Sequence, residues 1–444
     1  MNADQPESAS KNASTSLSEA SQAAIIAAHP DPKPVTLGST DPPVDQEANP
    51  AGTPTPDIPI ATGPGLQSPS DTETSPEPAT ALEAPLSNTP APDYEAPVFA
   101  TGVNLDSPLR AATWQTNSPQ EPWCPEALVA ILPWAVEFGE NYQDNETREL
   151  RHEGWRLVAA TRRGRMHAHN AEYREDAFAC EVGDGVLVIA VSDGAGAYEW
   201  SRIGSALTSH AITLSLRDWV STHRNELSKL DRAALVNAIA NQVRIALYEI
   251  LKGFVEVLSP QSGAKPKDFR CTLLLTVWCR TENAEALITM QVGDGFFGLL
   301  GRDGQAARHG EADSGQFSGE VTSFVPDPNA LDHATKSIKS HPADELEAIL
   351  ICSDGVEDPF YPIEKNAAVI FHELYHGLPR DTTNAAGVRH SGPVASVLDE
   401  HGGDALCTWL AFEKKGENDD RTIVLLHRDP PVPRLRIRTA TPTT

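Results

Sequence analysis

The stretch Val186–Gly196, VLVIAVSDGAG, decides the fold that we expect for this chain. Six apolar residues lead directly into Ser192-Asp193-Gly194, a pattern typical of a buried strand that ends in a glycine-containing turn. The stretch Ala348–Gly355, AILICSDG, repeats the pattern later in the chain, with Asp354 as the turn aspartate. Two such strands could bring two aspartates together at one edge of a sheet, where we expect metal chemistry.

The composition divides the 444 residues into an acidic arm and a folded body. The first hundred residues hold 18 of the 36 prolines and only two basic residues against 14 acidic ones. Such a segment buries too little apolar surface to offset the entropy of ordering it, so we expect a disordered arm over 1–110. We expect a helical or connecting lead-in over 111–153, a catalytic domain over 154–429 and a basic flexible tail over 430–444.

The charge and the cysteines exclude several classes of protein. A formal net charge of −27 argues against nucleic-acid binding, which needs a basic surface. The six cysteines form no CxxC pair, which favours a reduced cytoplasmic protein over a disulfide framework. No apolar run approaches the ~20 residues needed to cross a bilayer, and the polar N-terminus is unlike a signal peptide. We therefore expect a soluble, cytoplasmic protein that contacts neither membrane nor nucleic acid.

The pattern of strands and helices favours an α+β fold with layered sheets. Gly183-Asp184-Gly185 separates two strand-like runs and is a strong hairpin signal, and Gly293-Asp294-Gly295 repeats this arrangement. Strands are expected at Trp155–Ala160, Phe178–Val182, Val186–Val191, Cys271–Cys279, Ala284–Val292, Phe296–Leu300, Ala348–Cys352 and Thr422–His427. Helices are expected at Trp123–Phe138, Ser205–Val220, Arg232–Val257, Ala368–Tyr375 and Val394–Phe412. The charged stretch 141–154 is expected to be a connector or an exposed helix.

Four acidic sites stand at strand ends or turns, namely Glu175-Asp176, Asp193-Gly194, Asp354-Gly355 and Asp419-Asp420. A single Asp-Gly turn is usually structural, but four acidic sites in this strand context can converge on one edge. Oxygen ligands without a supporting Cys or His cluster select Mg²⁺ or Mn²⁺ over Zn²⁺. Four sites exceed the need of one ion, so we expect a pair of ions bridged by one aspartate.

Five motifs occur in an order that resembles the metal-dependent serine/threonine phosphatases of the protein phosphatase 2C type, in particular their divergent bacterial branch. They are Glu175–Phe178, Val191–Gly196, Val292–Gly295, Cys352–Gly355 and Asp419–Thr422. The resemblance covers about 157–427. It implies a four-layer αββα sandwich of two antiparallel sheets flanked by helices, with two Mn²⁺ or Mg²⁺ ions, and optionally a third, at one end.

The resemblance also implies a site and a reaction. Asp193 would bridge the two ions, Asp354 and Asp419 would complete one metal site, and Glu175 or Asp176 with the Gly194 carbonyl would complete the other. A metal-activated water would hydrolyse phosphoserine or phosphothreonine. The implied partners are phosphorylated proteins and a serine/threonine protein kinase in a signalling role.

Two positions depart from the pattern of the family. The arginine that often holds the phosphate falls on Ala171, and the candidates to replace it are Arg165, His167, His169 and Arg174. We favour His167, because Gly164-x-x-His167 resembles the entry to this motif in the divergent branch, and Arg174 is the second choice. Asp420 stands where asparagine is usual.

A rival signal lies at 372–376, where HELYH matches the HExxH signature of zinc peptidases on an expected helix. The third zinc ligand could be His390, Glu400 or His401. A zinc peptidase would leave the aspartates at the strand ends unexplained. A second alternative, suggested by the missing arginine, is a catalytically weak phosphatase-like module used for binding. We expect a phosphatase.

Overall fold

The computed structural model describes residues 117–310, 323–431 and 437–439. The expected arm over 1–110 and most of the expected tail over 430–444 lie outside the described residues. All of the described residues belong to one compact unit. None of the described helices combines the length and the apolar character that a membrane span requires.

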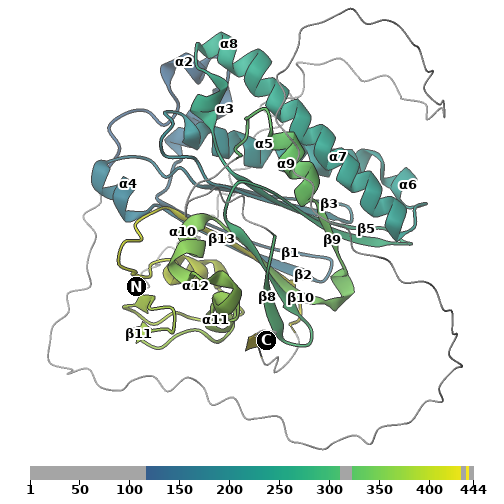
Figure 1. Cartoon of the computed structure of the whole chain (residues 1–444), viewed down its shortest axis with the longest axis vertical. Helices are drawn as coiled ribbons and strands as arrows, with labels where there is room; N and C mark the ends of the chain where they lie inside the picture. The colour runs from purple at the N-terminus through teal and green to yellow at the C-terminus, as the bar shows by residue number, and fades with distance from the viewer. Residues whose placement is uncertain (1–116, 311–322, 432–436, 440–444) are drawn as a thin grey trace, which may run out of the picture. The chain divides into compact units, whose positions relative to one another are not determined.

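Two sheets form the centre of the fold (Figure 1). One has the strand order β1 (Asn145–His152), β2 (Trp155–Arg162), β13 (Arg421–Arg428), β10 (Leu346–Cys352), β7 (Phe296–Gly301), β8 (Gln305–His309) and β14 (Arg438–Thr439). The other has the order β3 (Ala177–Gly183), β4 (Val186–Ser192), β5 (Leu273–Arg280), β6 (Glu285–Val292) and β9 (Lys339–His341). Neighbouring strands are antiparallel in both sheets, except that β14 runs parallel to β8. A separate ribbon pairs β11 (Thr382–Thr383) with β12 (Arg389–His390).

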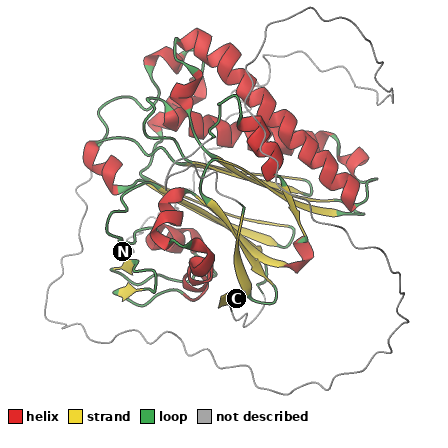
Figure 2. Cartoon of the chain, in the orientation of Figure 1, coloured by secondary structure: helices red, strands yellow, loops and turns green. Residues whose placement is uncertain are grey.

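Helices cover the outer face of each sheet (Figure 2). The helices that pack with the five-stranded sheet are α2 (Glu126–Val129), α3 (Pro133–Glu140), α5 (Ser201–Thr222), α6 (Arg224–Leu227), α7 (Arg232–Gly253), the π-helical turn Phe254–Leu258, α8 (Ser259–Ser262) and α9 (Ala330–Ser337). Those that pack with the seven-stranded sheet are α10 (Asp354–Glu357), α11 (Ile363–His376) and α12 (Gly402–Trp409). The remaining short helices are α4 (Arg165–Asn170) and the 3₁₀ turns Pro266–Phe269, Ala343–Glu345 and Asp358–Phe360. The predicted four-layer αββα sandwich is confirmed.

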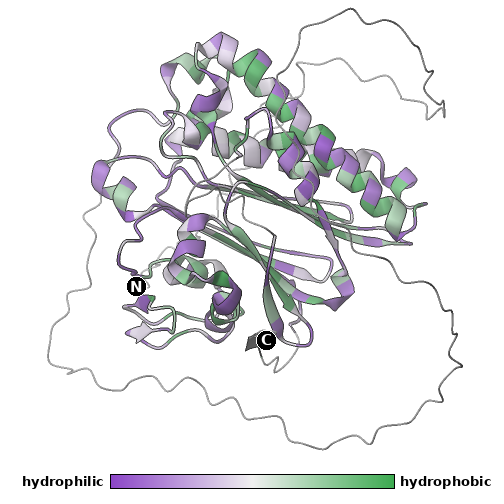
Figure 3. Ribbon diagram, in the orientation of Figure 1, coloured by the Kyte–Doolittle hydropathy of each residue, from purple (hydrophilic) through white to green (hydrophobic). Residues whose placement is uncertain are grey.

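The strand β4 shows how the sequence produces these layers. Every residue of β4 is buried, because its sheet is covered on both faces. Val186, Val188 and Ala190 face the helices, whereas Leu187, Ile189 and Val191 face the other sheet. Successive side chains of a strand point to opposite faces, so a strand between two layers needs apolar residues throughout. Figure 3 shows the resulting concentration of hydrophobic residues on the strands of both sheets.

The tripeptide Gly-Asp-Gly connects strands in two different ways. At Gly183-Asp184-Gly185, Gly183 pairs with Val186 across a tight turn, so the predicted hairpin of β3 and β4 is confirmed. Gly293-Asp294-Gly295 instead joins β6 of one sheet to β7 of the other, so the expected second hairpin is wrong. Its two glycines have φ values of +88° and +84°. A residue with a side chain would be strained in this conformation, whereas glycine is not.

The expectation of a connector or exposed helix at 141–154 is also wrong. Residues Asn145–His152 form β1, whose alternating exposure is typical of an edge strand. Glu153 and Gly154 both have positive φ and close a two-residue hairpin between β1 and β2, a turn that matches the twist of the strands. The sandwich therefore begins at Asn145 rather than at residue 154.

The helix expected over Val394–Phe412 is shorter than its apolar spacing indicated, because only Gly402–Trp409 is helical. The segment before it is held in an irregular path by Arg156, whose guanidinium donates hydrogen bonds to the carbonyls of Leu398 and Asp399 at 2.9 and 2.7 Å. These tertiary hydrogen bonds outweigh the local helical pattern.

Candidate metal centre

The strand register places two predicted acidic sites together in the five-stranded sheet. Ala177 pairs with Ser192, so the start of β3 lies beside the end of β4. Asp176 immediately precedes β3 and Asp193 immediately follows β4. Both carboxylates therefore belong to the same end of this sheet.

The seven-stranded sheet brings the other two acidic sites together in the same way. Cys352 pairs with Ile423, which places the end of β10 beside the start of β13. Asp354 follows β10, and Asp419-Asp420 precedes β13.

Asp193 from one sheet and Asp354 from the other meet in one cluster, while Asp419 and Asp420 form a second group with His167. Carboxylate oxygens of Asp193, Asp294 and Asp354 all lie within 4.8 Å of one another. Asp193 and Asp354 therefore come from two facing sheets, and the expectation that they share one edge of a single sheet is wrong. Asp294 joins them from the crossing between β6 and β7.

The serine of each Ser-Asp-Gly pattern anchors its turn. The Ser192 hydroxyl donates to the Thr272 carbonyl at 2.5 Å, and the Asp193 amide donates to Thr272 Oγ1 at 3.0 Å. These bonds attach the end of β4 to the residue that precedes β5, which fixes the backbone that presents the Asp193 carboxylate.

Ser353 has a second role, because it orients an acid from the other sheet. Its hydroxyl donates to Asp176 Oδ2 at 2.8 Å and accepts the Thr422 amide at 3.0 Å. The Thr422 side chain is held separately, since its Oγ1 lies 2.6 Å from Thr161 Oγ1.

Asp420 clamps the backbone around the centre and has almost no exposed surface. Its Oδ1 accepts the Gly164 amide at 2.6 Å, and its Oδ2 accepts the Glu175 amide at 2.6 Å and lies 2.9 Å from His167 Nδ1. Burial alone would raise the pKa of Asp420, but the hydrogen bonds and charge of His167 and the two amides hold it below its usual range. Burial likewise opposes protonation of His167, yet the bond to Asp420 raises its pKa to about 9.

Two glycines allow the Asp419-Asp420 segment to fit this close to its neighbours. A Cβ at Gly164 would lie 2.3 Å from the Asp419 carbonyl carbon, and a Cβ at Gly355 would lie 1.7 Å from the Asp420 carbonyl oxygen. Both distances are far below van der Waals contact, so these positions exclude any side chain.

Gly194 brings Glu175 to the centre for a similar reason. A Cβ at Gly194 would lie 2.9 Å from both the Glu175 Cβ and the Ser201 carbonyl carbon. The glycine therefore lets Glu175 lie against the turn that carries Asp193. This close packing is enough to explain why residue 194 is a glycine, whether or not an ion binds the Gly194 carbonyl.

Like charges dominate the electrostatics of the cluster. Burial, followed by the charges of Asp354, Asp176 and Asp419, raises the pKa of Asp193 well above its usual range. The pKa of Asp354 is raised in the same way, by burial and then by Asp294 and Asp419. Burial also raises the pKa of Asp176 to about 6 and that of Glu175 to about 7.

Two buried oxygens show that this donor set fits a cation. No donor among the described residues forms a hydrogen bond with Asp176 Oδ1 or Asp354 Oδ1. A buried carboxylate oxygen without a donor is costly, and a bound cation would satisfy it. The available ligands are carboxylates and backbone carbonyls, the oxygen ligands that Mg²⁺ and Mn²⁺ prefer.

The two residues predicted to hold phosphate have other contacts. Arg174 Nε donates to the Asp176 carbonyl at 2.9 Å, and its terminal nitrogens donate to the Gln143 carbonyl at 3.1 Å and to Glu146 at 3.2 Å. The His167 ring is buried against Asp420. Phosphate binding by either residue stays a prediction, and these contacts weigh against it.

The HELYH segment occupies the last turns of α11 and does not have the arrangement of a zinc site. Glu373 is buried, and its carboxylate accepts Asn384 Nδ2 at 2.7 Å and Trp409 Nε1 at 2.9 Å. Across the described ranges, His372 and His376 belong to no group of three potential ligands within 4.8 Å. The carboxylate of Glu373 therefore supports the packing of α12, and the structure gives no support to a zinc peptidase.

Asp294 is the site residue that we did not predict as a ligand. The sequence contained its signal, since Gly293-Asp294-Gly295 is one of the five family motifs. Interpreting the tripeptide as a hairpin hid its role, because a hairpin turn would have kept Asp294 within one sheet.

The protein phosphatase 2C family model matches residues 163–387, just over half of the chain. The chain belongs to the protein phosphatase 2C family, whose members are metal-dependent serine/threonine phosphatases. The matched range includes Glu175, Asp176, Asp193, Asp294 and Asp354 and ends before Asp419. No curated protein matches the chain.

Several solved structures are distantly similar. The serine/threonine phosphatase of S. agalactiae is 14% identical, with a TM-score of 0.38, and the match covers 64% of this chain and 99% of that one. The Mycobacterium tuberculosis phosphatase PstP/Ppp is 15% identical, with a TM-score of 0.33 and coverage of 62% and 98%. Stp1 of Staphylococcus aureus is 12% identical, with a TM-score of 0.35 and coverage of 64% and 95%. At these scores the likenesses add nothing to what the family match shows.

Proposed function

We propose that the chain is an active protein serine/threonine phosphatase that hydrolyses phosphoserine and phosphothreonine at the carboxylate centre. The observation that carries this proposal is the meeting of acids from both sheets at one cluster, with carboxylate oxygens of Asp193, Asp294 and Asp354 within 4.8 Å. A cluster of half-buried like charges is unfavourable for folding, so a structural role alone does not account for it.

We propose a binuclear site with Mn²⁺ or Mg²⁺ as the metal. The proposed ligands are Glu175, Asp176, Asp193, the Gly194 carbonyl, Asp294, Asp354 and Asp419. Asp193 is the shared ligand in this assignment, because its carboxylate interacts with acids from both sheets, Asp354 and Asp176 among them. Divalent cations at this site would acidify a water molecule and neutralise charge on the phosphoryl oxygens.

The chain's own residues hold the ligands in place before substrate arrives. Asp420 fixes the Glu175 amide, and its own amide donates to Asp419 Oδ1 at 2.8 Å, so one residue positions two proposed ligands. Ser353 holds Oδ2 of Asp176, which leaves Oδ1 of the same carboxylate for a cation. Such preorganisation avoids the cost of rearranging ligands during the reaction.

The proposed substrates are phosphorylated proteins, and the opposing enzyme is a serine/threonine protein kinase. We place the reaction in the cytoplasm. This location is supported by the cysteines, since the six are free thiols and five of them are buried, as expected in a reducing compartment.

Metal titration by calorimetry, together with hydrolysis of a phosphoserine peptide, tests the proposal. We expect two or more Mn²⁺ ions per chain and release of inorganic phosphate that EDTA abolishes. Binding of Mn²⁺ without turnover of any phosphopeptide would favour the binding module instead. Stoichiometric zinc that is lost in His372→Ala would favour the peptidase, and neither result is expected.

A further inference from the structure

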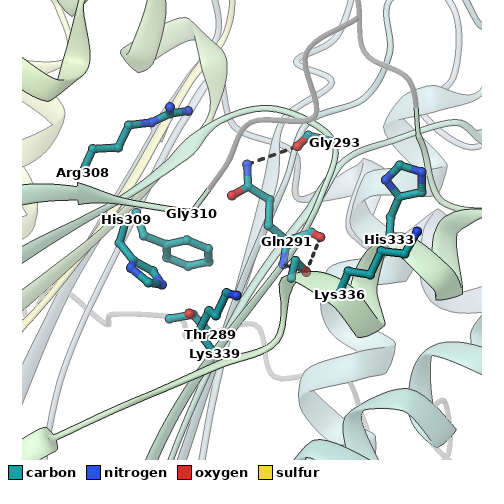
Figure 4. Close-up of a pocket in the computed structure, with 11 residues that line it drawn as sticks. Thr289, Gln291, Gly293, Arg308, His309, Gly310, His333, Lys336 and Lys339 are labelled. Carbon is teal, nitrogen blue, oxygen red and sulfur yellow. Dashed lines mark hydrogen bonds between the residues drawn. The ribbon is translucent and has the colours of Figure 1, made fainter. Parts of the chain in front are cut away.

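A pocket of about 480 Å³ lies beside the crossing that carries Asp294, and Figure 4 shows its lining residues. Its lining residues come from β6, β7, β8, α9 and the start of β9. Gly293 lines the pocket, and the next residue, Asp294, belongs to the carboxylate cluster. The pocket and the metal centre therefore share the crossing between the two sheets.

Basic side chains surround this pocket, namely Arg308, His309, His333, Lys336 and Lys339. Arg308 lies 2.8 Å from a Glu357 oxygen and 3.2 Å from a Glu364 oxygen, so its charge is largely compensated. Burial and the charge of Lys339 lower the pKa of His309, which leaves that ring neutral. The positive charge of the pocket therefore rests mainly on the two lysines.

Lys336 and Lys339 are exposed, and among the described residues neither forms an ion pair with a carboxylate. They occur in a chain with a formal net charge of −27, where lysine and arginine are outnumbered 62 to 35 by acidic residues. A pocket with two lysines that no described carboxylate pairs with differs in sign from the chain as a whole, so it would attract an anion that the rest of the protein repels.

Gln291 supplies a second observation that points to a ligand. Its side chain is buried, and Nε2 donates to the carbonyls of Gly293 and Gly295 at 3.1 and 2.9 Å. These two bonds fix the orientation of the amide, since only nitrogen can donate to carbonyl groups. Gln291 Oε1 is buried without a hydrogen-bond donor among the described residues, in a residue that lines the pocket.

We propose that this pocket binds an acidic side chain of the phosphoprotein substrate, close in sequence to the phosphorylated residue. The inference rests on the proposed phosphatase function, which it refines by naming the class of substrate. Lys336 and Lys339 would pair with the carboxylate, and Gln291 Oε1 would accept an N–H of the bound segment. An extended segment advances about 3.3 Å per residue, so a few residues suffice to reach from the pocket to the adjoining metal centre.

The unpaired acceptor distinguishes a peptide from a free phosphate ion. A phosphate dianion has one O–H donor and three acceptor oxygens, so most of its surface would meet the lone pairs of Gln291 Oε1 unfavourably. A peptide offers both a carboxylate for the lysines and backbone N–H groups for the amide oxygen. The pocket therefore fits an acidic peptide better than inorganic phosphate.

Fluorescence anisotropy with the full chain in EDTA tests the binding without any turnover. Two labelled peptides would differ only in three glutamates, replaced by glutamines in the second, with an unphosphorylated serine beside them. We expect tighter binding of the glutamate peptide, weakened about two- to fivefold by Lys336→Gln or Lys339→Gln, the range for exposed ion pairs. The control is Lys229→Gln, an exposed lysine after α6 at the other end of the five-stranded sheet, which should change nothing.

Equal affinity for the two peptides would overturn the proposal, and it is also the result expected if the chain's own acidic N-terminal segment filled the pocket. An equal effect of Lys229→Gln and Lys336→Gln would overturn it as well, since attraction would then be unspecific.

Kinetics separate this inference from the proposed function. We expect kcat/KM to favour a phosphoserine peptide with nearby glutamates, with the preference reduced in the Lys336→Gln, Lys339→Gln double variant. Hydrolysis of p-nitrophenyl phosphate should stay unchanged in that variant, because this substrate carries no acidic residue that the pocket could bind. A wild-type chain that hydrolyses neither substrate would refute the phosphatase function, while the anisotropy result still decides whether the pocket binds acidic peptide.

Discussion

The ion pair between His167 and Asp420 gives a prediction whose size follows from the structure. The bond to Asp420 raises the pKa of His167 from an ordinary value of 6.5 to about 9. Each unit of difference between folded and unfolded states corresponds to 1.36 kcal/mol, so protonation of this buried ring stabilises the metal-free fold by about 3 kcal/mol. Because the folded pKa is the higher one, this stabilisation is complete below pH 6.5 and is lost as the pH rises through 9.

The variant His167→Ala leaves the Asp420 carboxylate buried without its cationic partner. We expect it to lower the free energy of unfolding by about 3 kcal/mol or more at pH 6, with the deficit shrinking towards pH 10. The matched control is His169→Ala, on the same helix α4, whose side chain is exposed.

Urea denaturation in EDTA at pH 6, 8 and 10 measures both variants against the wild type. EDTA is needed because cations near Asp419 and Glu175 would change the charge that His167 experiences. The ion pair does not stabilise the fold if His167→Ala is no less stable than His169→Ala at pH 6, or if its deficit is the same at all three pH values.

Two further predictions concern the carboxylates and the glycine contacts. Burial raises the pKa of Asp176 to about 6 and of Glu175 to about 7, so in EDTA the fold should lose stability as the pH rises through that range. Saturating Mn²⁺ should reverse this trend in thermal denaturation, since cations bind the deprotonated acids, and an unchanged trend would contradict the metal assignment. Gly355→Ala places a Cβ 1.7 Å from the Asp420 carbonyl oxygen and should destabilise the fold by about 2 kcal/mol or more. Gly253→Ala, at a helical glycine with open space around it, should be neutral or stabilise by up to about 1 kcal/mol, and equal losses in both variants would rule out the contact at Gly355 as the cause.

The buried strands could be predicted from the sequence because burial on both faces demands continuous apolar residues. The run Val186–Val191 is such a case, and the strand extends from Val186 to Ser192. The acids at the strand ends were equally visible, since each stands next to a glycine or a strand boundary. Antiparallel pairing then places an acid before one strand beside an acid after its neighbour, as for Asp176 and Asp193.

The edge strand β1 could not be predicted from periodicity, because Asn145–His152 contains only one aliphatic residue. Its partner β2 supplies the apolar face and the hydrogen bonds that make it a strand. The turn at Glu153-Gly154 was the sequence signal for this hairpin. It predicts a hairpin only if a strand is already assumed on each side of it.

The assignment of strands to sheets was the other missing step. Apolar runs do not show which sheet a strand joins, so Gly293-Asp294-Gly295 had the same appearance as the true hairpin turn at Gly183-Asp184-Gly185. Asp294 consequently went unnoticed as a possible ligand. The contacts of His167 and Arg174 were hidden for a similar reason, since their partners Asp420 and Glu146 are distant in sequence.

The structure also explains why the chain carries Asp420 where asparagine is usual in the family. Its two carboxylate oxygens accept two amides and pair with a charged histidine, and an asparagine offers only one acceptor oxygen for these groups. The aspartate and His167 therefore belong together as one positioning device beside the metal centre.

Hydrolysis of p-nitrophenyl phosphate in Mn²⁺ by wild type, Asp193→Asn and Asp344→Asn tests the central claim most directly. Asp344 is an exposed acid just before β10, at the opposite end of the strand from Asp354, so it controls for the loss of one negative charge. We expect activity that requires Mn²⁺ in the wild type and in Asp344→Asn, and no activity in Asp193→Asn. Retained activity in Asp193→Asn would contradict a role for this carboxylate at the metal centre.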